Sequence, residues 1–190
     1  MEQFRFNLKV AEDLYLAMPM YVDKVAEKLF EVLDSDREHI GKYLDFVEKT
    51  QTIEDERAFI ASQLNDQAAG KSYLYLIIYQ GDLVGTINYH FVNHQHGRAE
   101  IGYWLHSAYT GKGLVSRCVK AMLTIGFESL GFNRIDLYAD VENAPSNAVA
   151  TRTGFKFNAL QPAQVKMHGQ FRDMNQYIML KSDYEVSKED

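Results

Sequence analysis

The chain has 190 residues, a formal net charge of −6 and 46% hydrophobic residues. These values are typical of one folded domain of ordinary size and exclude a disordered chain. The acidic balance argues against nonspecific nucleic-acid binding, which requires a basic face. Because Cys118 is the only cysteine, an intramolecular disulfide and a cysteine-rich metal site are both excluded.

Targeting and membrane signals are absent from the sequence pattern. Residues 1–7 contain no apolar segment flanked by basic residues, so no signal peptide is predicted. The longest apolar run, residues 73–79, is too short to span a bilayer. We therefore expect a soluble, cytoplasmic protein with no membrane partner. No linker or internal repeat divides the chain, so residues 1–190 are predicted to form a single domain.

The first third of the chain is predicted to be mainly helical. After an extended stretch ending near Pro19, apolar residues recur at helical spacing. Ser35 with Glu38, and Thr52 with Asp55, are capping-box patterns that mark further helix starts. Three helices are therefore expected, over residues 22–33, from Ser35 toward Glu48, and from Thr52 to about Gly70. The acidic run at 54–56 is interpreted as a favourable first helical turn; the alternative is the rim of a site that attracts an amine.

From residue 73 the apolar period changes to two, which predicts strands. The expected strands cover residues 73–79, 83–92, 98–106, 134–141, 155–160 and 172–180. A helix that begins at Leu114 and ends at Gly131 joins two of them, and it is long enough for a crossover. The strands at 98–106 and 134–141 should therefore run parallel. The predicted class is a mixed α/β fold with a largely antiparallel sheet, N-terminal helices and a crossover helix.

The glycine turn before that crossover helix is the most informative feature. Gly111 and Gly113 precede the first turn of an amphipathic helix, and Lys112 stands between them. Such a turn presents several backbone N–H groups at a helix N-terminus, where the helix dipole adds partial positive charge. Glycine suits these positions because a side chain would obstruct phosphate oxygens. The turn therefore predicts a ligand that carries a phosphate or pyrophosphate.

Several short motifs together resemble a known family. They are residues 99–105 (Ala-Glu-Ile-Gly-Tyr-Trp-Leu), 111–113 (Gly-Lys-Gly), 133–135 (Asn-Arg-Ile), 143–147 (Asn-Ala-Pro-Ser-Asn) and 154–155 (Gly-Phe). In this order and spacing they resemble the GNAT N-acetyltransferases, and within them the RimJ/RimL branch. The best-known members of that branch acetylate the N-terminal α-amine of ribosomal proteins. The resemblance covers nearly the whole chain.

The resemblance implies a GNAT-like sheet that is splayed at its parallel strand pair and binds acetyl-CoA there. Backbone groups of Trp104 and Leu105 would bond the pantetheine arm, and Asn143 would position it. The pyrophosphate would be bound by the backbone amides of Gly111, Lys112, Gly113, Leu114, Val115 and Ser116. Thr110 and Val115 depart from the residues that are usual in the family, although both sites contribute mainly backbone N–H groups. The resemblance also makes a homodimer an expectation.

Two residues are predicted to carry the chemistry. Glu100 is the candidate base, acting directly or through water. It shares a strand face with Gly102, Trp104 and His106, and the resemblance implies the role because some GNAT branches place their base at this glutamate. The same alternation suits a structural carboxylate that pairs with Arg98 or with a neighbouring strand. The resemblance makes Ser146 the candidate proton donor to the departing thiolate; the alternative is that Asn143 and Ser146 cap the short helix predicted over residues 146–153.

The other candidate residues are interpreted more simply. Val165 stands where members of the branch often carry a glutamate, so a base at that position is absent. His168, nearby, is an alternative base. The stretch of His94 and His96 is interpreted as a solvated hairpin loop, since no zinc-type signature accompanies it. Cys118 is predicted to be a small core residue and not a nucleophile.

The predicted reaction is acetyl transfer from acetyl-CoA to a primary amine, with no metal. An α-amine with a pKa of about 8 is roughly 10% neutral at pH 7, whereas a lysine with a pKa of about 10.4 is below roughly 0.1% neutral. An N-terminal acceptor therefore needs less help from a base and is the favoured one. One alternative is acetylation of a small amine such as a polyamine or an aminoglycoside-like compound. The other is a non-catalytic coenzyme-A-binding domain, which Val165 and Thr110 suggest.

Overall fold

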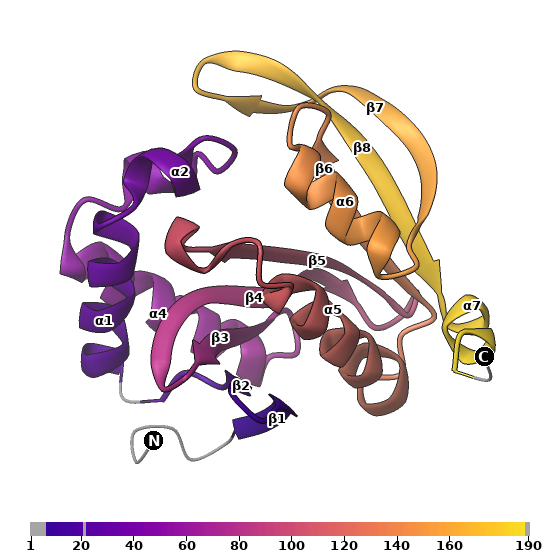
Figure 1. Cartoon of the computed structure of the whole chain (residues 1–190), viewed down its shortest axis with the longest axis horizontal. Helices are drawn as coiled ribbons and strands as arrows, with labels where there is room; N and C mark the ends of the chain where they lie inside the picture. The colour runs from indigo at the N-terminus through magenta and orange to yellow at the C-terminus, as the bar shows by residue number, and fades with distance from the viewer. Residues whose placement is uncertain (1–6, 21, 189–190) are drawn as a thin grey trace. The chain divides into compact units, whose positions relative to one another are not determined.

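The computed structural model describes residues 7–20 and 22–188, which form a mixed α/β fold (Figure 1). The strand order is β1-β2-β3-β4-β5-β6-β8-β7, and β5 with β6 is a parallel pair. The strands are β1 (Asn7–Ala11), β2 (Leu14–Ala17), β3 (Tyr73–Tyr79), β4 (Asp82–Asn93), β5 (Arg98–Leu105), β6 (Arg134–Asp140), β7 (Lys156–Met167) and β8 (Gln170–Leu180). The predicted fold class and the predicted parallel pair are confirmed.

The chain divides into two compact units. The first comprises the residues up to Asn88 together with Tyr103–Leu114, and the second comprises Tyr89–Gly102 together with the residues from Val115 onward. The helices of the first unit are α1 (Val22–Asp34), α2 (Arg37–Gly41), α3 (Phe46–Lys49) and α4 (Ile53–Ala68). The second unit contains α5 (Leu114–Thr124, from its second residue on), α6 (Ala144–Arg152) and α7 (Lys181–Val186). The assignment of residues 1–190 to one domain stays a prediction.

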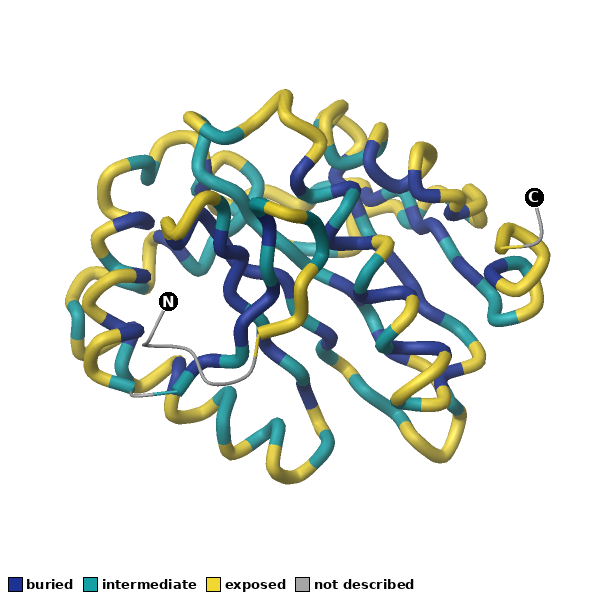
Figure 2. The backbone as a smooth tube through the Cα atoms, turned by 60° about the horizontal axis from the view of Figure 1, so that its bottom comes forward, coloured by how far each residue is buried: buried dark blue, intermediate teal, exposed yellow. Residues whose placement is uncertain are grey.

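In the first unit, α1 and α4 pack over β2 and β3. The buried residues of α1 recur every three to four positions, so one apolar stripe faces the core. Thr52 caps α4 as predicted, because its hydroxyl accepts the Asp55 N–H while the Asp55 carboxylate accepts the Thr52 N–H. Figure 2 shows the resulting alternation of buried and exposed positions along the helices. The predicted extended stretch is a hairpin of β1 and β2, and its first six residues lie outside the described ones.

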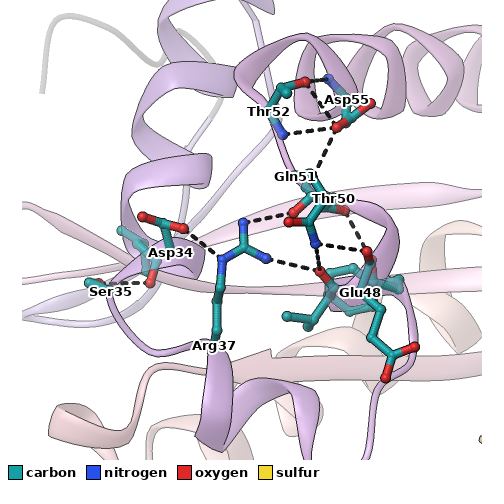
Figure 3. A network of polar contacts seen from close by, with 11 residues as sticks. Asp34, Ser35, Arg37, Glu48, Thr50, Gln51, Thr52 and Asp55 are labelled. Atoms are coloured by element: carbon teal, nitrogen blue, oxygen red, sulfur yellow. Dashed lines mark hydrogen bonds and ion pairs between the residues drawn. The ribbon is translucent and has the colours of Figure 1, made fainter. Parts of the chain in front are cut away.

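The helix predicted from Ser35 toward Glu48 is wrong, because two short helices, α2 and α3, occupy that stretch. Ser35 does not cap a helix N-terminus; its hydroxyl donates to the Val32 carbonyl at the end of α1. Arg37 explains the interruption (Figure 3), since its guanidinium donates to the Asp34 carboxylate and to the carbonyls of Val47 and Thr50. These bonds satisfy backbone carbonyls in and just after α3, where carbonyls have no partner within the helix. Arg37 thereby ties the start of α2 to the end of α3.

In the second unit, the crossover helix ends in a π-helical segment, Ile125–Ser129. Tyr89 accounts for it: its hydroxyl donates to the Met122 carbonyl at 2.6 Å, which releases that carbonyl from the regular helical pattern. Gly126 makes room for the ring, because a Cβ there would lie 2.6 Å from the Tyr89 hydroxyl. The helix then stops at Gly131, with φ 70°, as predicted.

The hairpin of β7 and β8 is longer than predicted. Pro162 suggests a strand end in the sequence, but β7 continues past it through a bulge between Gln161 and Val165. Ala163 has φ 48° there, and its N–H donates to the Asp173 carboxylate.

The C-terminal helix α7 was not predicted. Within residues 7–20 and 22–188, no helix is long and apolar enough to cross a membrane.

Candidate active site

The glycine turn has the conformation that its sequence predicts. Gly111 has φ 75° and Gly113 has φ 69°, a region that residues with a side chain rarely adopt, and α5 begins at the next residue. A Cβ at either glycine would meet no protein atom within 4 Å, so the space beside the turn is open. Thr110, the departure from the family pattern, closes the preceding turn because its hydroxyl donates to the Ser107 carbonyl. The residues present therefore fit a phosphate group.

In the first unit the turn is held from the end of α1. The Asp36 carboxylate accepts the Ser107 N–H at 2.6 Å and the Ser107 hydroxyl at 2.9 Å. His106 Nδ1 accepts the Ala108 N–H, so its other nitrogen is left to donate to the Ser35 hydroxyl at 3.3 Å. These bonds fix the chain immediately before the glycines.

Lys112 stands over two aromatic rings. Its ammonium lies 5.4 Å from the Tyr79 ring centre and 5.1 Å from that of Tyr109. The two rings themselves meet edge to face at 6.1 Å. Cation–π contacts of this kind reduce the freedom of an exposed lysine. The positive charge is thereby kept at the turn, where it can meet an anion.

Leu114, Val115 and Ser116 form the first turn of α5. Ser116 is buried, and its hydroxyl accepts a hydrogen bond from the Arg152 guanidinium at 3.2 Å within the second unit. The Ser116 side chain is therefore engaged with α6, and the binding role of its backbone N–H stays a prediction. Arg152 adds a cation next to this helix start, and nothing in the sequence pattern singled it out.

Trp104 and Leu105, the predicted pantetheine contacts, lie in the first unit at the end of β5. The Trp104 carbonyl lies so close to β4 that a Cβ on Gly85 would come within 2.2 Å of it. Successive residues of a strand direct their backbone groups to opposite edges. The backbone N–H and C=O of Leu105 therefore face away from β4, whereas those of Trp104 face toward it. The Trp104 side chain packs against two apolar clusters, one between helices α1 and α4 and strands β2, β3 and β4, the other formed by α1, α2 and α3.

In the second unit, Glu100 is the last residue of β5 in register with β6. The paired positions are Arg98 with Arg134, Ala99 with Ile135 and Glu100 with Asp136, after which β6 continues beside β8 alone. The Glu100 side chain is 26% exposed, and its Oε1 lies 3.0 Å from Nε2 of His90 on β4. The alternative of a partner on a neighbouring strand is thus observed, and Arg98 is not that partner.

The other carboxylates on this face of β6 are fully engaged. The Asp136 carboxylate receives two bonds from Arg134 and one from Gln176. The Asp140 carboxylate receives two from Arg172 and one from the Glu142 N–H. The bonds from Arg172 and from that N–H hold the pKa of Asp140 below its usual range. Neither aspartate has the freedom that a base requires, whereas Glu100 is bound to an imidazole.

Tyr138 lies beside Glu100 on the same face. Burial raises its pKa, and the negative charges of Asp136 and Glu100 raise it further. Its hydroxyl oxygen accepts a bond from Gln176 at 2.8 Å, so its own proton can be donated elsewhere. Sequence alternation could have placed Tyr138 on this face, but it gave no sign of the electrostatic interaction with Glu100.

Asn143 and Ser146 lie at the start of α6. The Asn143 side chain accepts the Ser146 backbone N–H at 3.2 Å, so Asn143 is the residue that caps the helix. The cap involves the backbone N–H of Ser146 and does not involve its hydroxyl. The capping interpretation is therefore confirmed for Asn143 and does not account for the Ser146 side chain.

The remaining candidates occupy different surroundings. Cys118 is fully buried and burial raises its pKa to about 12, which confirms it as a core residue. His168 and Gly169 form the exposed turn of the β7–β8 hairpin. Strand geometry puts that turn ~26 Å along β8 from Ile178, the register neighbour of Asp136. Val165 lies opposite Arg172, and no group of metal-binding side chains occurs in the described part of the chain.

Comparison with known proteins gives the class. The sequence profile of the acetyltransferase (GNAT) domain matches residues 18–156, and the chain belongs to this family of acetyltransferases. It is 30% identical to the "Putative ribosomal N-acetyltransferase YdaF" of Bacillus subtilis (strain 168), over 96% of this chain and all of that protein.

Two further relatives extend the comparison. The chain is 24% identical to the ribosomal-protein-serine acetyltransferase of Escherichia coli (strain K12), over 92% of this chain and 96% of that one. Among solved structures, the microcin C7 self immunity acetyltransferase MccE, in complex with acetyl-CoA and AMP, superposes with a TM-score of 0.87. That match has 25% identity and covers 94% of this chain and 98% of the other. The predicted family, fold and acyltransferase activity are confirmed.

Proposed function

We propose that the protein transfers the acetyl group of acetyl-CoA to the N-terminal α-amine of a ribosomal protein. The names of the two sequence relatives support the acceptor, and the acetyl-CoA complex of MccE supports the donor. The observation that carries the proposal is the state of Glu100. It is the last residue of β5 that pairs with β6 and is partly exposed, whereas arginines neutralise Asp136 and Asp140.

The binding roles follow from the backbone. The amides from Gly111 to Ser116 bind the pyrophosphate, aided by the dipole of α5 and by the charge of Lys112. The backbone groups of Leu105, which face away from β4, bond the pantetheine arm, and Asn143 positions it. Trp104, whose carbonyl lies against β4, has no part in this role. The positive φ of the two glycines and the open space beside them support these assignments.

The chemical roles need one base and one acid. Glu100 takes a proton from the acceptor ammonium, directly or through a water molecule. The neutral nitrogen then attacks the thioester carbonyl carbon, so that a C–N bond forms and the C–S bond breaks. The nitrogen, which is positively charged once bonded, loses a second proton to water to give the neutral amide. The Ser146 hydroxyl gives its proton to the leaving sulfur and regains one from solvent. Because an α-amine is already roughly 10% neutral at pH 7, one carboxylate suffices, and a second at position 165 is not required.

The test is thiol release from acetyl-CoA with a panel of peptides, polyamines and aminoglycosides. We expect turnover with peptides that begin with serine or alanine and none with the same peptides blocked at the N-terminus. Turnover with small amines alone would overturn the acceptor. Coenzyme binding without turnover on any acceptor would favour a domain that has lost catalysis. Pairing of two copies stays a prediction, which light scattering of the purified protein tests.

A further inference from the structure

His90, in the second unit, contacts the proposed base Glu100 but has no role in the proposed chemistry. It lies on β4, its side chain is 30% exposed, and its Nε2 lies 3.0 Å from Oε1 of Glu100. An ionised carboxylate can only accept hydrogen bonds, so the proton of this bond belongs to Nε2. The described residues give the Glu100 carboxylate no other hydrogen bond, which leaves Oε2 for a substrate.

The His90 ring also contacts the aromatic ring of Phe91. The Phe91 ring meets it edge to face, with 4.9 Å between ring centres. Phe91 is 78% exposed and has φ 49°, an uncommon conformation for a bulky residue. Strained residues of this kind persist where the surrounding structure holds them and are frequent at functional sites. The imidazole of His90 is thereby held by two contacts, with the Phe91 ring and with the Glu100 carboxylate.

The neighbouring charges do not compete for Glu100. Asp136, its register neighbour, is engaged by Arg134 and Gln176, and among the described residues no hydrogen bond joins the Tyr138 hydroxyl to Glu100. The orientation of the Glu100 carboxylate therefore depends on His90 more than on any other side chain of this face. A base held in one orientation reacts faster, since the cost of ordering it does not fall on the transition state.

We propose that His90 is a positioning residue for the base: its Nε2–H holds Oε1 of Glu100, so that Oε2 is the oxygen that receives the proton of the acceptor amine. This inference rests on the proposed function. Its alternative is that His90 only packs against Phe91 and contributes to folding.

Two substitutions separate these roles. His90→Gln keeps an N–H donor and removes the ring, whereas His90→Phe keeps a ring against Phe91 and removes the donor. With acetyl-CoA and a peptide that begins with serine, we expect His90→Phe to lower kcat about tenfold, as loss of one positioning hydrogen bond would. We expect the KM for acetyl-CoA to be unchanged. His90→Gln should retain kcat within about threefold, and His96→Ala, in the exposed β4–β5 turn, serves as the control.

A double-mutant cycle with Glu100→Gln distinguishes the two proposals. If His90 acts through Glu100, His90→Phe should add no further loss to Glu100→Gln. Full activity of Glu100→Gln would refute the proposed base itself. We expect Glu100→Gln to lower kcat strongly but to leave a measurable rate, because an α-amine is partly neutral without a base. Two results would then overturn the role of His90: losses that multiply, or equal losses for His90→Gln and His90→Phe. Imidazole ¹⁵N spectra give a readout without turnover, and a proton found on Nδ1 in place of Nε2 would also overturn it.

Discussion

The carboxylate of Asp36 holds both polar groups of Ser107, the backbone N–H at 2.6 Å and the hydroxyl at 2.9 Å. The two residues are 71 positions apart, so this contact fixes the approach to the glycine turn from the end of α1. It also explains why Asp36 stands at the N-cap position of α2 without capping it.

The first prediction concerns this anchor. Asp36→Ala should raise the Kd for coenzyme A about tenfold. Without the anchor the glycine turn would be more flexible, and the conformational entropy lost on ordering it would reduce the binding free energy. The measurement is isothermal titration, with a thermal melt to check folding. Asp45→Ala, which removes only an exposed pair with Lys49, is the control. An unchanged Kd in Asp36→Ala would show that the turn holds its shape without this contact.

Gly113→Glu should abolish coenzyme A binding. The new side chain would fill the open space beside the turn, place a negative charge there and strain a residue with φ 69°. Gly81→Glu is a matched control, since Gly81 has φ 95° in the β3–β4 turn and a similar backbone strain. Retention of the wild-type Kd in Gly113→Glu would refute the phosphate assignment.

Ser146→Ala should lower kcat while the Kd for coenzyme A stays within a few-fold. The cap of α6 should be kept, because it uses the Ser146 main chain. Asn143→Ala should instead cost about 1 kcal/mol of stability through loss of that cap. Single-turnover rates and chemical denaturation measure the two effects. If Ser146→Ala unfolds as readily as Asn143→Ala, its hydroxyl is structural.

Glu56 should make stability depend on pH. It is 2% exposed in the first unit, and its Oε2 has no hydrogen-bond partner among the described residues. Burial raises its pKa to about 7 and the charge of Asp55 adds to this, while Arg37 opposes it. Because the folded-state pKa lies above the ordinary 4.5, the native state binds the proton more tightly than the unfolded state between these values.

The stability that this proton contributes is complete below about pH 4.5 and is lost as the pH rises through about 7. The whole change is about 3 kcal/mol. Glu56→Gln, which mimics the protonated group, should be neutral at pH 4.5 and stabilising at pH 8. Urea denaturation across this range measures it. A variant whose stability tracks the wild type at every pH would contradict the burial argument.

Gly126→Ala should destabilise the second unit by about 2 kcal/mol, because its Cβ would lie 2.6 Å from the Tyr89 hydroxyl and 2.7 Å from Ile135. Gly41→Ala is the contrasting case. Its Cβ would meet Val47 at an ordinary 3.5 Å, so the better helix propensity of alanine should leave stability equal or higher. Equal melting temperatures for the two variants would show that the π-helical segment can move aside.

The sequence predicted those elements whose signals are local. The capping box at Thr52 and Asp55, the stop at Gly131 and the turn at Gly111 and Gly113 each depend on a few adjacent residues. The Ser35 pattern is just as local, yet it failed. Asp36 and Arg37 are drawn to partners at Ser107 and Val47, and these contacts outweigh the helix preference of the segment.

The candidate site was predicted in part for the same reason. Alternation placed Glu100 on one face of its strand, but the bond to His90 depends on the neighbouring strand β4. Likewise, the neutralisation of Asp136 and Asp140 depends on Arg134, Gln176 and Arg172, which no motif connects. Burial of Glu56 was hidden within an acidic run that looks solvent-exposed in sequence.

Trp104 is the only tryptophan of the chain, and it packs into the core of the first unit. Its fluorescence therefore observes one half of the molecule selectively, whereas far-ultraviolet circular dichroism sums over both. Melting curves recorded by the two methods should coincide if the units unfold in one cooperative step. A gap between the curves would reveal an intermediate in which one unit is folded and the other is not.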